Sequence, residues 1–184
     1  MKKGILLSLM SLVLAFTASG QKYFTRDGKI SFYSDTPLEK IEAHNSKATS
    51  VLDAATGNIE FAVLIKAFQF EKALMQEHFN ENYMESSKFP KASFKGKVAN
   101  IKDINLKKDG EYNATVKGQL TIHGVTKDVE TTGKFIVTGG KIAAKSTFNI
   151  AVADYDITIP AVVRDNIAKT VKITVDTKLE ELKQ

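Results

Sequence analysis

The chain has 184 residues, a formal net charge of +5 from 26 Lys and Arg against 21 Asp and Glu, and no cysteine. The absence of cysteine excludes disulfides, thiolate metal sites, cysteine nucleophiles and a lipidated N-terminal cysteine. Basic and acidic residues are interspersed, which is typical of a solvated surface and not of one that follows a phosphate backbone. We therefore expect no nucleic-acid partner.

The first 20 residues have the pattern of a secretory signal peptide. Two lysines precede a short apolar run, and small residues follow at Ala18 and Gly20. A transmembrane helix requires about 20 apolar residues, and this run is shorter. The pattern predicts export to the periplasm with cleavage near Gly20, no integral membrane span, and one domain over residues 21–184.

Most of the remaining chain alternates apolar and polar residues with the two-residue period of β-strands. The clearest run extends from Tyr112 to Ile122, and another extends from Asn58 to Ala67. Three dipeptides predict tight hairpin turns between the runs: Asp109-Gly110, His123-Gly124 and Gly139-Gly140. About eight antiparallel strands result. Because a closed barrel leaves no exposed strand edges, the sequence predicts an all-β barrel.

One stretch, residues 68–96, breaks the two-residue rhythm and predicts a helix. Met75, Phe79 and Tyr83 are each four residues apart and would form an apolar side, as would Leu74 and His78. Pro90 is expected to end the helix, and a strand follows it.

This helix is expected to pack alongside the barrel. In the strand predicted over residues 58–67, Ala62 and Leu64 are apolar although they lie on the face opposite the inward row. The helix is the expected cover for that face, through Leu74, Met75 and Phe79, at about 1.5–3 kcal/mol for each buried side chain.

The inward rows of the predicted barrel are its candidate ligand-binding residues. An eight-stranded barrel is either filled by side chains or holds one small ligand. Small residues interrupt two of the inward rows, at Ala114 and Gly118 and at Ala144 and Ser146, which favours a cavity. The candidate residues are Phe61, Val63, Ile65, Tyr112, Ala114, Val116, Leu120, Ile122, Phe135, Phe148 and Tyr155.

The sequence offers little support for catalysis. It contains no nucleophile elbow, phosphate-binding glycine loop or zinc-protease motif. His44, His78 and His123 are far apart in the chain, and no pair has metal-ligand spacing. We expect neither an enzyme nor a bound metal, although a site assembled in three dimensions from His78, Glu81 and a distant carboxylate stays open. His123 is expected to bond the backbone at its turn.

Two segments resemble the YceI-like family of exported lipid-binding proteins. Residues 118–129, Gly-Gln-Leu-Thr-Ile-His-Gly-Val-Thr-Lys-Asp-Val, are similar to the hallmark hairpin of that family. Residues 84–96, which include Lys-Phe-Pro-Lys-Ala-Ser-Phe, are similar to its connection from helix to strand. The resemblance extends over roughly Asn58 to Leu179. It implies a lipocalin-like barrel with a helix alongside, and an apolar tunnel for an isoprenoid or fatty-acyl chain.

These observations lead to one preferred hypothesis and one alternative. The preferred function is non-enzymatic binding and transport of a long-chain apolar lipid in the periplasm, with no cofactor other than that lipid. Tyr112, Asp154 and Tyr155 are the candidates for orienting its polar head. The alternative is a filled barrel that serves as a structural or protein-interaction module of the cell envelope. The oligomeric state stays open, with a homodimer as one option.

Overall fold

The computed structural model describes residues 21–182, so the predicted signal peptide lies outside it. Eight long strands and one two-residue strand make up most of the fold, as the alternation predicts. Their bounds are β1 (Lys22–Asp35), β2 (Lys40–Asp53), β3 (Asn58–Leu64), β4 (Gln69–Phe70), β5 (Lys91–Val98), β6 (Gly110–Ile122), β7 (Val125–Thr138), β8 (Lys141–Ala151) and β9 (Thr170–Glu181).

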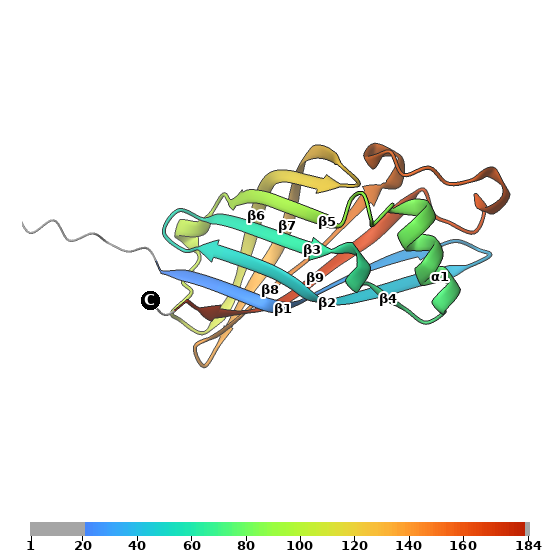
Figure 1. The fold of residues 1–184 in the computed structure, drawn as a ribbon. Coiled ribbons are helices and arrows are strands. Elements are labelled where there is room, and N and C mark those ends of the chain that lie inside the picture. The colour runs from blue at the N-terminus through green and yellow to red at the C-terminus, as the bar shows by residue number, and fades with distance from the viewer. Residues whose placement is uncertain (1–20, 183–184) are drawn as a thin grey trace, which may run out of the picture.

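The eight long strands form a closed antiparallel barrel (Figure 1). The strand order is β1-β9-β8-β7-β6-β5-β3-β2, and β2 also pairs with β1. Each long strand therefore pairs with a neighbouring strand on both sides. The short β4 pairs with β2 on its other side. Closure removes the unpaired N–H and C=O groups that an open sheet of this size would expose. The predicted fold class is confirmed.

One helix of 11 residues accompanies the barrel, which confirms the predicted helix. Its first six residues are α1 (Ala73–His78), and five residues with π-helical bonding follow, η2 (Phe79–Tyr83). Four short 3-10 helices lie in the connections: η1 (Ile65–Ala67), η3 (Ile101–Asp103), η4 (Val152–Tyr155) and η5 (Ala161–Val163).

The helix covers a different surface from the one that the sequence predicts. Leu64, on the outer face of β3, is 47% exposed, and Leu74 of the helix is 61% exposed, so the two do not pack together. Instead the helix lies across one end of the barrel (Figure 1), where Met75 and Phe79 face the interior. On the outer face of β3, Leu64 is therefore left exposed, while Ala62 is half-buried.

Two of the three predicted hairpin turns are confirmed, and one is wrong. At the β6–β7 turn His123 and Gly124 have φ of 51° and 78°, as a two-residue turn between antiparallel strands requires, and the turn at residues 139–140 is similar. Before Gly110, however, the chain is not a strand but a connection of residues 99–109 that contains η3. The Asp109 carboxylate accepts a hydrogen bond from the Gly139 N–H, 3.0 Å away, and so braces the neighbouring turn.

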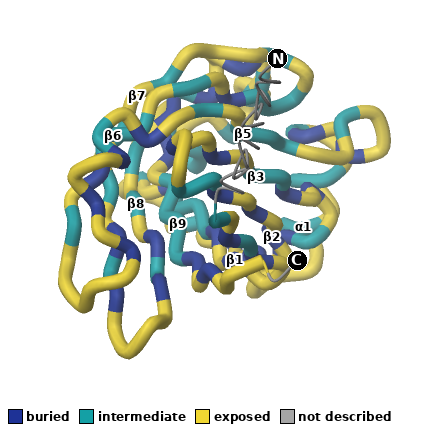
Figure 2. The backbone as a smooth tube through the Cα atoms, turned by 90° about the vertical axis from the view of Figure 1, so that its left-hand side faces the viewer, coloured by how far each residue is buried: buried dark blue, intermediate teal, exposed yellow. Residues whose placement is uncertain are grey.

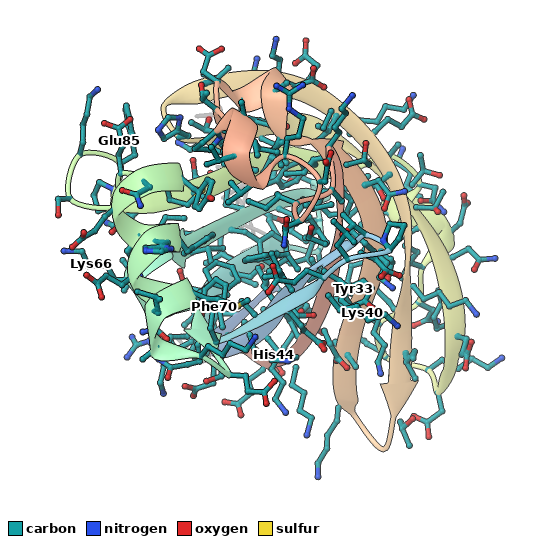
Figure 3. The ribbon with its side chains drawn as sticks, turned by 90° about the vertical axis from the view of Figure 1, so that its right-hand side faces the viewer. Tyr33, Lys40, His44, Lys66, Phe70 and Glu85 are labelled. Carbon is teal, nitrogen blue, oxygen red and sulfur yellow. The ribbon has the colours of Figure 1, made fainter. Side chains whose placement is uncertain are left out.

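The two ends of the barrel differ in how they are filled. At the end that holds both described termini, which we call the closed end, the inward side chains pack against each other and against apolar residues of the 99–109 connection. Figure 2 looks at this end and shows buried and exposed segments alternating along the strands. The opposite end, which we call the open end, carries α1, the β1–β2 turn and residues 152–169 (Figure 3).

Candidate functional site

The open half of the barrel encloses a cavity of about 390 Å³. This volume lies within the range of roughly 300–1,000 Å³ that is typical of sites for small molecules. Every long strand contributes to its wall, and most of the side chains are aliphatic or aromatic. Among those that line it are Ile30, Phe32, Phe61, Val63, Phe94, Val116, Leu120, Ile122, Val129, Phe148, Ile150, Val171, Ile173 and Val175.

A cluster of four phenylalanines forms the wall of the cavity beneath the helix. Phe32 comes from β1, Phe68 and Phe70 come from the segment before α1, and Phe79 comes from the helix. Their ring centroids are 5.0–5.7 Å apart, and the rings of Phe32 and Phe79 are stacked. Such contacts stabilise each aromatic pair by about 0.5–1.5 kcal/mol beyond the burial of its area. The cluster holds the helix to the barrel and gives the cavity an aromatic side.

Gly118, one of the small residues from which the sequence predicts a cavity, makes room for an aromatic ring instead. Gly118 lies directly opposite Gly96 on β5, and the Phe94 ring covers both glycines. A Cβ at Gly118 would meet the Gly96 Cα at 2.4 Å and the Phe94 Cζ at 2.8 Å. The missing side chains therefore make room for the Phe94 ring, whereas Ala114, Ala144 and Ser146 do line the cavity.

The wall of the cavity is incomplete between β7 and β8. Their ladder runs only from Gly133 paired with Ser146 to the turn, and beyond Ser146 the two strands separate toward the open end. The Ser146 hydroxyl donates a hydrogen bond to the Thr132 carbonyl at 2.7 Å where the ladder stops. Residues of the 152–169 connection complete the lining: Ile157, Ile159, Val163, Asn166 and Ile167.

Polar contacts join the elements around the mouth of the cavity. The Asn166 side-chain amide donates to the Glu39 carboxylate at 3.1 Å, and the Lys72 ammonium lies 3.9 Å from the other oxygen of that carboxylate. The Ala168 N–H donates to the Ser34 hydroxyl at 2.8 Å. These bonds tie the β1–β2 turn to the 152–169 connection, and they place a carboxylate and an amide beside a mostly apolar cavity.

His123 braces the same end from the outside. Its Nε2 lies 2.9 Å from the Glu85 carboxylate and its Nδ1 lies 3.2 Å from the Tyr155 carbonyl, and its ring meets the edge of Phe89. Apart from glycines, positive φ occurs among residues 21–182 only at His123, Glu85 and Asp156, the last of which follows Tyr155. The three residues with positive φ thus lie together, where the helix end, the β6–β7 turn and the 152–169 connection contact each other. The predicted bond from His123 to the backbone is present.

The cavity brings together nine of the eleven sequence-predicted site residues. They are Phe61, Val63, Ile65, Ala114, Val116, Leu120, Ile122, Phe135 and Phe148. Tyr112 lies toward the closed end, where its hydroxyl donates to the Lys108 carbonyl at 2.9 Å. Tyr155, the last residue of η4, is buried against Leu120, Ile150, Val152 and Val171, and that burial, with Asp154 nearby, raises the pKa of its phenol. Neither tyrosine faces the cavity, so neither is placed to hold the head of a ligand there.

Two groups of residues at the mouth are not among the sequence-predicted site residues. Glu39 and Asn166 are far apart in the chain, and no local pattern predicts that their side chains meet. The apolar residues of the 152–169 connection carry a signal in the sequence, since Ile157, Ile159 and Val163 form an apolar run around Pro160 that no strand contains. An apolar run in an irregular segment predicts a lining or a cover, because loops are otherwise mostly polar.

Two further properties concern metals and membranes. Within residues 21–182 no three His, Asp or Glu side chains gather as metal ligands. His78 lines the cavity near its mouth, away from His123. Over the same residues, no helix has both the length and the apolar composition to cross a bilayer.

This protein therefore belongs to the class of closed β-barrels with an internal cavity. The cavity is mostly apolar, and a helix lies across the end at which it opens. The chain belongs to the YceI-like domain family, whose family model matches residues 17–179. This match confirms the family resemblance of the sequence. Among curated proteins, none matches the chain.

Solved structures share this fold at low sequence identity. A polyisoprenoid-binding domain from Saccharophagus degradans implicated in plant cell wall breakdown superposes with a TM-score of 0.77 at 13% identity, over 89% of this chain and 99% of that one. BcnA of Burkholderia cenocepacia gives 0.69 at 16% identity, over 83% and 96%. The YceI protein of Campylobacter jejuni gives 0.54 at 16% identity, over the full length of both chains.

Proposed function

We propose that this protein is a non-catalytic carrier of one long-chain apolar lipid, an isoprenoid or fatty-acyl compound, and that it works in the periplasm. The observation that carries the proposal is the cavity itself, whose wall is mostly apolar and which reaches the open end. The similar fold of a polyisoprenoid-binding domain supports the choice of ligand class.

Burial of the lipid chain supplies the binding energy in this account. Each methylene that leaves water contributes about 0.8 kcal/mol, which corresponds to roughly a fourfold gain in affinity. The polar head is expected at the mouth, beside Glu39 and Asn166, where a carboxylate and an amide are available for hydrogen bonds. A head with a hydroxyl group or a neutral carbonyl fits these partners better than an anionic head does, because the Glu39 carboxylate repels anions.

Organic extraction of the purified protein followed by mass spectrometry tests the proposal. We expect one long-chain lipid per protein molecule. After delipidation, fatty alcohols of increasing length should compete for the cavity with a fluorescent polyene alcohol. Their affinity is expected to rise about fourfold per methylene until the cavity is full. A protein that yields no lipid and binds no chain of any length would instead favour the filled-barrel module.

We also propose export, on the basis of the first 20 residues of the sequence. The intact mass of the protein from a periplasmic fraction is expected to correspond to a chain that begins at Gln21. A mass that includes residues 1–20 would count against both cleavage and the periplasmic location.

A further inference from the structure

The large apolar side chains that are exposed on this protein are unevenly distributed. Among residues 21–182, six such side chains are exposed, and the three most exposed are Val162 at 91%, Leu38 at 69% and Leu74 at 61%. They belong to η5, to the β1–β2 turn and to α1, three elements that all lie at the open end (Figure 1). The other three, Val51, Leu64 and Leu182, are between 44% and 47% exposed and belong to β2, β3 and the residue after β9.

The three residues surround the mouth of the cavity. Each immediately precedes a residue that lines it: Leu38 precedes Glu39, Leu74 precedes Met75, and Val162 precedes Val163. The elements approach the mouth from different sides, with α1 along one side and the 152–169 connection along another (Figure 3). We call Leu38, Leu74 and Val162 the rim residues. A surface that covers them also covers the opening of the cavity.

Each rim residue also has a cation two positions away in the chain. Lys40 follows Leu38, Lys72 precedes Leu74, and Arg164 follows Val162. All three cations are exposed. An apolar side chain with a cation beside it matches the interface of a bilayer, where the acyl region lies directly below the layer of phosphates.

The charge of the rim decides which kind of bilayer it fits. Glu71 and Asp165 are exposed beside Lys72 and Arg164, and the Glu39 carboxylate lies 3.9 Å from the Lys72 ammonium, so three acids balance the three cations there. Attraction to a strongly anionic surface is therefore a minor contribution. The cations instead match the phosphates that zwitterionic phospholipids also carry, and insertion of apolar side chains supplies most of the affinity.

We propose that the rim docks on the surface of a phospholipid bilayer, with Leu38, Leu74 and Val162 inserted below the phosphates and Lys40, Lys72 and Arg164 among them. In this orientation the cavity opens onto the acyl region, and a lipid chain passes between bilayer and barrel without crossing water. The biological purpose of the docking rests on the proposed carrier function, but the docking is a separate physical property.

Flotation with phosphatidylcholine vesicles tests the docking. The rim variant is Leu38→Ser, Leu74→Ser and Val162→Ser together. The matched control is Val51→Ser, Leu64→Ser and Leu182→Ser together, which removes the three less exposed apolar side chains, on β2, on β3 and just after β9. We expect the native protein and the control to float with the vesicles, and the rim variant to lose at least about tenfold in partition coefficient, since each inserted side chain contributes through its buried apolar area.

Each outcome has a defined meaning. A native protein that does not float, or a rim variant that floats as well as the control, overturns the docking. A rim variant that loses lipid in cells although the native protein never binds vesicles also overturns it, and indicates that a protein partner delivers the lipid. If the native protein floats and only the rim variant fails to float, but extraction yields no lipid, the docking stands and the carrier function fails.

Discussion

The closed and open ends of this barrel are built from the same eight strands, yet one is a packed core and the other is a cavity. At the closed end Leu52, Ile142 and Leu179 are at most 4% exposed and pack against apolar residues of the 99–109 connection. At the open end inward residues of the same strands, such as Phe148 and Ile173, are only partly buried and line the cavity.

The connections between strands account for this difference. The 99–109 connection turns Ile101, Ile104 and Leu106 inward, and these side chains fill the closed end like a plug. At the open end the helix and the 152–169 connection border the mouth without filling it, and the phenylalanine cluster lies on one side. Alternation along a strand determines which side chains point inward, but the segments that cover each end determine whether those side chains meet.

The largest effect on the free energy of unfolding is expected when one isoleucine at each end is truncated to alanine. Ile142→Ala at the closed end should lower the free energy of unfolding by about 3–5 kcal/mol, because it leaves a new void in a packed cluster. Ile173→Ala at the open end should cost at least 1 kcal/mol less, since Ile173 already borders a cavity and has fewer contacts to lose. Urea denaturation of both delipidated variants measures the difference. Equal losses would mean that the two ends are packed alike.

A smaller effect is expected where the open end is braced by His123. His123→Asn keeps a residue that tolerates positive φ but removes the ring contacts to Glu85, Phe89 and the Tyr155 carbonyl. Loss of these contacts should cost about 1–2 kcal/mol of unfolding free energy. Hydrogen exchange should increase in α1 and in residues 152–169 while the closed end stays protected. A uniform increase over the whole barrel would contradict a local brace.

The smallest effect is expected at the surface of the closed end. Asp109→Ala removes the bond from the Gly139 N–H to the carboxylate, but both groups are exposed to water, which can replace the bond. The loss in unfolding free energy should stay under about 1 kcal/mol. Thermal unfolding of Asp109→Ala and Ile142→Ala, measured side by side, compares the two losses in unfolding free energy. A loss as large as that of Ile142→Ala would show that the turns, and not the packed cluster, hold the closed end together.

Much of the barrel and its inward rows could be predicted from the sequence, because the two-residue period is a direct consequence of strand geometry. The helix was predictable from Met75, Phe79 and Tyr83, but its position was not. Leu74 occurs with the spacing of a core residue and is nevertheless exposed, since helical spacing identifies a face of the helix and does not identify what that face contacts.

The parts of the site that could not be predicted lie in irregular segments. The side chains of Glu39 and Asn166 meet only because two connections converge at the open end. Tyr112 follows the same alternation as Ala114 and Val116, yet it lies beyond the floor of the cavity. The depth of the cavity along the strand is set by the side chains of the 99–109 connection that fill the closed end, and the strand itself does not determine it.

One pair of substitutions on β6 tests most directly whether the open end is hollow in order to hold a lipid chain. Val116 is half-buried and faces the cavity, whereas Ala114, two residues earlier, is 3% exposed within the closed-end cluster at the floor of the cavity. We expect delipidated Val116→Trp to be about as stable as the native protein, since the indole enters existing space, but to carry no lipid on extraction. Ala114→Trp should overpack the cluster and lose about 1–3 kcal/mol. A Val116→Trp protein that is strongly destabilised when delipidated, or that still carries its full load of lipid, would contradict the account.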